Sequence, residues 1–103
     1  MQIFRMLLLG ALLLLAAAVS AQPVSFELRN NSLQSIPLVI TGVMNPNLSP
    51  MSNSGVTTET GTTIFFFHKR KRYLLLEVSP ALEGKRIVVD ELIRDRKREL
   101  GLN

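Results

Sequence analysis

The most concentrated chemistry in this sequence is a run of five basic residues: His68, Lys69, Arg70, Lys71 and Arg72. Ammonium and guanidinium groups bind phosphates of lipid headgroups or of nucleic acid, and this binding weakens as salt is added. The run is therefore a candidate anion-binding site. The same charges have a second interpretation, because Lys and Arg beside apolar strands keep those strands soluble. The residues alone leave both interpretations open.

Other kinds of chemistry find little support. His68 is the only histidine and the chain has no cysteine, so the usual nitrogen and sulfur ligands of a metal site are missing. The sequence contains neither a Gly-x-Ser-x-Gly motif nor a glycine-rich phosphate loop. We therefore expect no catalytic residue, no metal and no cofactor, and a protein that is not an enzyme.

Residues 1–21 have the pattern of a signal peptide. Arg5 supplies a positive charge, an apolar run extends from Met6 to Val19, and small residues lead to Ala21. The apolar run is shorter than the roughly 20 residues that a spanning helix needs. We expect cleavage after Ala21, no transmembrane span in the mature chain, and export to the periplasm or secretion from the cell. The alternative is an uncleaved anchor helix.

Length and composition limit the remainder of the chain. The 103 residues include 12 Lys and Arg against 8 Asp and Glu, a net charge of +4. Residues 22–103 suffice for one small domain. The absence of cysteine excludes a disulfide scaffold, so the core alone must hold the fold, and we interpret this as favouring a bacterial periplasm. Since an exported protein rarely meets nucleic acid, we do not expect nucleic acid as a partner.

Two strands are predicted in the first part of the domain. Apolar and polar residues alternate over 24–28, which is the period of a half-buried strand. Asn30, Asn31 and Ser32 then favour a turn. The apolar, β-branched residues 38–43 predict a second strand, in which Gly42 marks a bulge.

Residues 44–61 are rich in Pro, Gly, Asn and hydroxyl residues, and they predict a long polar loop. Residues 56–60 favour a short edge strand within it. The loop is a candidate site for a protein partner, because its amides and hydroxyls can recognise peptides or sugars. An edge strand is a second candidate, since it can accept a strand from another chain.

The last part of the domain predicts a hairpin, a strand and a helix. Residues 62–67 and 73–78 are apolar and β-branched or aromatic, and they flank the basic run as a hairpin would. Their consecutive apolar residues indicate that both faces are covered, at least in part. Residues 86–89 predict a final strand, and residues 90–100 a helix with Asp90 as its N-cap and Gly101 at its end.

These elements favour an all-β fold: a small antiparallel β-sandwich of five or six strands, closed by the short C-terminal helix. The alternative is an α+β arrangement, an open sheet with one packed helix. We interpret the protein as an exported, non-catalytic binding or structural module of the cell envelope or periplasm. The alternative function is an anion-binding protein that places the basic hairpin tip on phosphorylated lipid or polysaccharide.

Overall fold

The computed structural model describes residues 22–103. The predicted signal peptide, residues 1–21, lies outside the described residues. None of the helices within 22–103 is long and apolar enough to cross a membrane.

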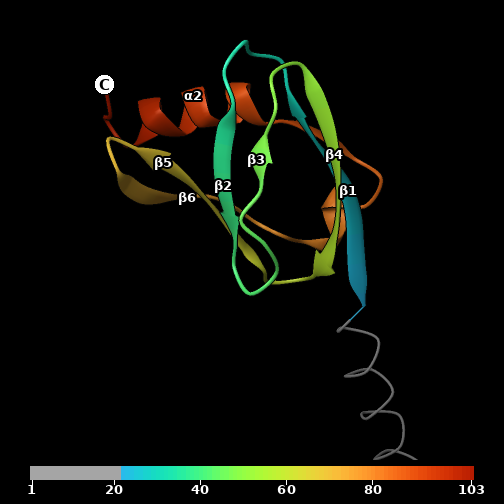
Figure 1. Ribbon diagram of the computed structural model, residues 1–103. Helices are drawn as coiled ribbons and strands as arrows, with labels where there is room; N and C mark the ends of the chain where they lie inside the picture. Colours follow the sequence, from blue (N-terminus) through green and yellow to red (C-terminus); the bar gives the residue numbers. More distant parts are fainter. Residues whose placement is uncertain (1–21) are drawn as a thin grey trace, which may run out of the picture.

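The described residues are mostly β-structure, arranged as two sheets with one short helix at the C-terminal end (Figure 1). The three-stranded sheet has the order β4-β1-β7, and the four-stranded sheet has the order β3-β2-β5-β6. The elements are β1 (Pro23–Asn30), β2 (Ile36–Ile40), β3 (Asn47–Leu48), β4 (Ser52–Glu59), β5 (Thr63–His68), β6 (Lys71–Glu77), the 3-10 helix η1 (Pro80–Leu82), β7 (Arg86–Val88) and α2 (Val89–Glu99).

The strand count and one pairing differ from the expectation. The described residues hold seven strands rather than five or six, because β3 adds a strand of only two residues. Neighbouring strands are antiparallel except for β1 and β7, which are parallel. Strands β1 and β7 lie at opposite ends of the domain sequence, so no hairpin turn between them requires an antiparallel pair.

The prediction of a long loop over 44–61 is wrong for its second half. Residues 52–59 form β4 and pair with all eight residues of β1, so the predicted edge strand exists and is longer than 56–60. Val56 and Thr58 are buried opposite Phe26 and Val24. This tertiary pairing holds a polar segment in a strand that its own composition does not favour.

The predicted hairpin is confirmed as β5 and β6. Phe65 pairs with Leu74 and Ile64 with Leu76, which leaves Leu75 as the extra residue of a bulge. Leu75 is fully buried and Leu76 packs against the core, as expected where a bulge turns two successive side chains toward one side. Gly42, predicted to mark a bulge, instead lies in the turn after β2 with a φ of 73°.

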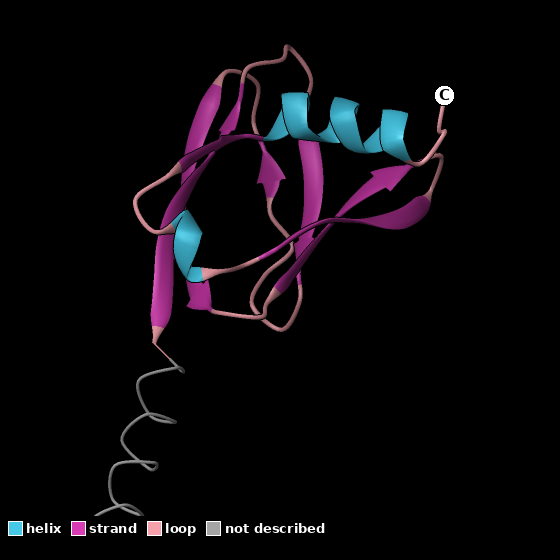
Figure 2. Ribbon diagram, turned by 180° about the vertical axis from the view of Figure 1, so that it is seen from behind, coloured by secondary structure: helices cyan, strands magenta, loops and turns pink. Residues whose placement is uncertain are grey.

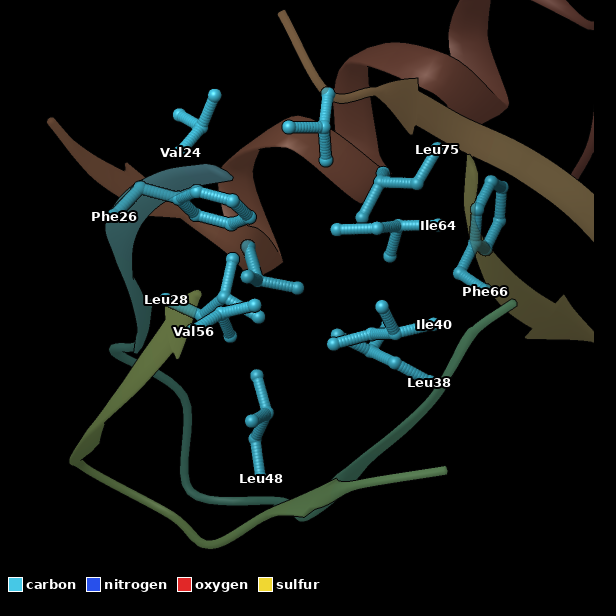
Figure 3. Packing of buried hydrophobic residues seen from close by; sticks show 12 residues of the cluster. Val24, Phe26, Leu28, Leu38, Ile40, Leu48, Val56, Ile64, Phe66 and Leu75 are labelled. Atoms are coloured by element: carbon cyan, nitrogen blue, oxygen red, sulfur yellow. The ribbon is translucent and has the colours of Figure 1, made fainter. Parts of the chain in front are cut away.

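The core consists of buried side chains from both sheets. Figure 3 shows residues of β1 and β4 pointing toward residues of β2, β5 and β6. The cluster comprises Val24, Phe26, Leu28, Leu38, Ile40, Leu48, Val56, Ile64, Phe66, Leu75, Val78 and Val89. Phe66 is its largest fully buried member. The two sheets therefore share one core.

Helix α2 lies across one end of the strands, as Figure 2 shows from behind. Val89 is buried, and Leu92 and Ile93 pack against the core. The helix begins one residue before the predicted start, and Asp90 is not its N-cap. Asp90 Oδ1 accepts a hydrogen bond from the Asn31 backbone amide at 2.9 Å instead, so this carboxylate joins the helix to the turn after β1.

The end of α2 agrees with the prediction. Gly101 has a φ of 69°, and the Leu102 amide donates to the Lys97 carbonyl at 2.8 Å, which is the hydrogen bond of a Schellman motif. Arg96 Nε donates to the Leu75 carbonyl oxygen at 3.0 Å. That bond anchors the last turns of the helix to β6, close to the hairpin tip.

Candidate functional site

The basic run lies at the tip of the β5–β6 hairpin, as predicted. His68 pairs with Lys71, so Lys69 and Arg70 alone form the turn. Their φ values are 49° and 69°. A two-residue turn with both φ values positive ordinarily contains Asn-Gly, because other side chains are strained in that conformation. Lys69 and Arg70 thus occupy turn positions whose backbone conformation favours Asn and Gly over long side chains.

The four cations of the tip are exposed and unpaired. Within residues 22–103 the ion pairs join Arg86 to Glu27, Arg96 to Glu99 and Arg98 to Asp95, and none includes residues 69–72. Two acidic residues of α2, Asp95 and Glu99, therefore pair with cations of the same helix and not with the hairpin charges. Arg72 lies differently from the others, with its guanidinium carbon 5.2 Å from the centre of the Phe65 ring.

His68 does not add to this charge at neutral pH. Partial burial of the ring, followed by the nearby Lys97 and Lys69 ammonium groups, holds the pKa of His68 below its ordinary value of 6.5, although the Asn103 backbone opposes the shift. Its ring centre is 6.4 Å from that of Tyr73. The predicted run of five is thus four cations beside a neutral imidazole.

The C-terminal residues lie beside the hairpin tip, which residue types alone did not indicate. Figure 1 shows the chain end next to the β5–β6 turn. A hollow of about 300 Å³ lies between them. It is lined by His68, Lys69, Lys71, Tyr73, Gly101, Leu102 and Asn103. The Schellman motif at the end of α2 is what directs Leu102 and Asn103 toward the hairpin.

The outer face of the four-stranded sheet is apolar, and the sequence analysis missed this surface. Val39, Phe65 and Leu74 are aligned across three neighbouring strands, on the side opposite the core. Leu74 is 43% exposed and Phe67, the next outward residue of β5, is 42% exposed. Both faces of this hairpin were expected to be covered at least in part, and within residues 22–103 the outer face is covered only in part, with Phe65 half-buried. The signal was the run of apolar residues at 64–67, because successive strand residues point to opposite faces.

The outer face of the three-stranded sheet is polar. A hollow of about 600 Å³ lies there, and Glu27, Gly55 and Arg86 are among the residues that line it. The Ser25 and Thr57 hydroxyls are 2.9 Å apart, and Arg86 lies 3.5 Å from the Glu27 carboxylate. Several polar groups of this face are therefore paired with one another.

The candidate partner sites of the 44–61 segment are also changed by the structure. Residues 44–51 remain irregular around the two-residue β3, and the remainder belongs to β4. One side of β4 pairs with β1, and no other strand of the described residues pairs with the opposite side. Groups of three or more His, Cys, Asp or Glu side chains able to hold a metal ion do not occur among residues 22–103.

Comparison of the chain with models of protein families, with curated proteins and with solved structures finds no match. The surfaces described above are therefore the basis for a functional proposal.

Proposed function

We propose that this chain is an exported, non-catalytic binding module of the cell envelope or periplasm. The observation that supports the binding role is the apolar row formed by Val39, Phe65 and Leu74, with Phe67 beside it. Contiguous apolar surface of this kind is typical of interaction sites, because exposing it to water is unfavourable. Export rests on the pattern of residues 1–21.

We also propose that the two sheets pack face to face as a β-sandwich. The shared core supports this arrangement, since both sheets contribute buried side chains to one cluster. The α+β alternative, an open sheet with one packed helix, is less favoured because Leu100 is 51% exposed and the helix contributes little beyond Val89, Leu92 and Ile93.

Two measurements test the proposal. Expression of the full chain in a bacterium, followed by intact mass of the periplasmic protein, should give a chain that begins at Gln22. Photo-crosslinking from position 74 in the envelope should yield adducts, whereas crosslinking from position 57 on the polar face should not. A mature chain that retains residues 1–21, or equal crosslinking from both positions, would contradict the proposal. So would hydrolytic turnover that is lost in His68→Ala.

A second candidate function is anion binding by the hairpin tip. It is favoured by the four exposed cations that take part in no ion pair of the described residues. The ligand class is phosphorylated lipid or acidic polysaccharide, because both present several anionic groups at close spacing. His68 belongs to this candidate site as a neutral hydrogen-bonding group rather than as a charge.

The test of this second candidate uses dextran sulfate and a salt series. Changing Lys69, Arg70, Lys71 and Arg72 to Gln should abolish retention, and retention of the unchanged protein should fall steeply as salt rises. A matched control changes four other exposed basic residues to Gln: Lys85, Arg86, Arg94 and Arg98. Both variants lose the same net charge, so equal weakening in both would refute a specific site at the tip.

A further inference from the structure

The cationic tip adjoins the apolar outer face. Arg72 lies on that face beside Phe67, whereas Lys71 pairs with His68 on the opposite side of the hairpin. Phe67 and Arg72 are register partners at the tip end of the hairpin, and the Arg72 guanidinium extends back over the Phe65 ring. Phe65 in turn pairs with Leu74. A molecule that contacts the cations of the turn therefore also reaches the exposed rings and the leucine beside them.

This surface changes in character along the hairpin. At the end far from the tip, the Thr41 and Thr63 hydroxyls are 2.9 Å apart. The middle is the apolar row with Phe65 and Leu74, and the tip carries the four cations. An amphipathic surface of this order matches the boundary of a bilayer, where phosphates lie next to hydrocarbon.

We propose that this surface docks on an anionic lipid bilayer, with Arg72 and the turn residues Lys69 and Arg70 at the headgroup phosphates and with Phe67 and Leu74 directed toward the hydrocarbon. The inference rests on the second candidate function, anion binding by the tip, and it names the ligand. Charge complementarity selects the bilayer. A soluble polyanion would use the cations and leave Phe67 and Leu74 in water, whereas a second copy of the chain would bring four more unpaired cations to the same surface.

The turn conformation gives independent support. Lys69 and Arg70 hold positive φ values that Asn-Gly would adopt with less strain. A strained local conformation is expected where a function requires the side chains that cause it. A role confined to solubility would be met equally by cations on neighbouring unstrained positions.

The test uses residues 22–103, the expected mature chain, and vesicles of phosphatidylcholine with or without phosphatidylglycerol. The protein should sediment with the mixed vesicles only. The variant with Gln at positions 69–72 should bind at least about a hundredfold more weakly, because each Lys or Arg near an anionic surface contributes severalfold. The double variant Phe67→Ser with Leu74→Ser should lose about tenfold, because less apolar surface is buried. Circular dichroism establishes that each variant is folded.

Two further variants sharpen the test. Leu33 is 84% exposed and lies outside this surface, so Leu33→Ser is the matched control for loss of an apolar side chain and should bind as the unchanged protein does. In a Leu74→Trp variant the fluorescence should shift to shorter wavelength when mixed vesicles are added. Absence of that shift while the protein sediments would overturn insertion of the apolar face.

The possible outcomes distinguish failure of bilayer docking from failure of anion binding by the tip. If the Phe67 and Leu74 double variant binds mixed vesicles unchanged, the bilayer inference fails while anion binding stands. If the positions 69–72 variant still binds both vesicles and dextran sulfate, both fail. If the unchanged protein is a dimer that the double variant dissociates, the apolar face belongs to a second copy and the bilayer inference is overturned.

Discussion

The outer faces of the two sheets show how one difference in residue pattern changes a surface. Residues 24–29 of β1 alternate strictly, so their outward residues are Ser25, Glu27 and Arg29 and the outer face is polar. Residues 64–67 of β5 are all apolar, so half of them must point away from the core. One sheet thus satisfies its outer polar groups internally, whereas the other presents rings and leucine to the surroundings.

The largest expected effect on the free energy of unfolding comes from truncating neighbouring Phe side chains that point to opposite faces of β5. Phe66 is fully buried and Phe67 is 42% exposed. Phe66→Ala should lower the free energy of unfolding by about 3 to 5 kcal/mol, because it leaves a cavity in the core. Phe67→Ala should lower it by less than about 1 kcal/mol. Urea unfolding followed by circular dichroism measures both. Equal losses would mean that both faces of β5 are buried in the folded protein.

A smaller effect is expected at the residue that joins the two sheets. Asn30 is fully buried at the end of β1, and its Nδ2 donates to the carbonyl oxygens of Gln34 at 2.8 Å, Leu48 at 3.2 Å and Ser49 at 3.1 Å. Asn30→Ala leaves these acceptors without their donor, so the free energy of unfolding should fall by about 2 kcal/mol.

The neighbouring residue is the control for this change. Asn31 is exposed, and its contact with Asp90 is made by the backbone amide, which alanine keeps. Asn31→Ala should change the free energy of unfolding by less than about 0.5 kcal/mol. If both variants unfold at the same urea concentration, the buried amide of Asn30 does not hold the sheets together.

Local pattern was sufficient where a segment's own residues favour its structure. Three local patterns each predicted the element that forms. They are the alternation over 24–28, the two apolar segments that flank the basic run, and Gly101 at a helix end. The pattern failed for β4, because Ser52 to Gly55 is polar and only the pairing with β1 makes it a strand. It also placed Asp90 as an N-cap, since the competing Asn31 amide comes from another part of the chain.

For the candidate site too, some features follow from local sequence and others depend on tertiary structure. The sequence placed the cations at a hairpin tip, because the flanking strands are strong local signals. It did not reveal the positive φ values of Lys69 and Arg70 or the approach of Asn103, which depend on strand register and on the docking of α2. Nor did the apolar run show that Phe67 is exposed, since apolar residues in a small domain are usually needed in the core.

The strain of the turn gives a further prediction. Changing Lys69 to Asn and Arg70 to Gly should raise the free energy of unfolding by about 1 kcal/mol, because these residues accept positive φ values readily. Changing both residues to Gln removes the same two charges and keeps the strain, so it should give no such gain. A gain in both variants would attribute the effect to charge repulsion in the tip rather than to backbone conformation.

The smallest expected effect is a change in the pKa of His68, which distinguishes lysines near the hairpin tip from lysines on the polar face. Lys97 and Lys69 both lower the pKa of His68, so Lys97→Gln should raise that pKa measurably in an NMR titration of the ring, whereas Lys85→Gln on the polar face should not. The folded protein disfavours the protonated ring relative to the unfolded chain. The stability that His68 contributes is therefore present above its unfolded pKa and is lost as the pH falls through the lower folded pKa.

Anionic vesicles extend this titration. Headgroup phosphates at the tip would offset the positive potential that Lys69 creates at the imidazole, so binding should move the pKa of His68 upward. Phosphatidylcholine vesicles, which carry no net charge, should leave it unchanged. An upward shift that persists in the Phe67 and Leu74 double variant would mean that the phosphates reach the tip without the apolar face. His68 therefore reports, from within the candidate site, whether its two parts act together.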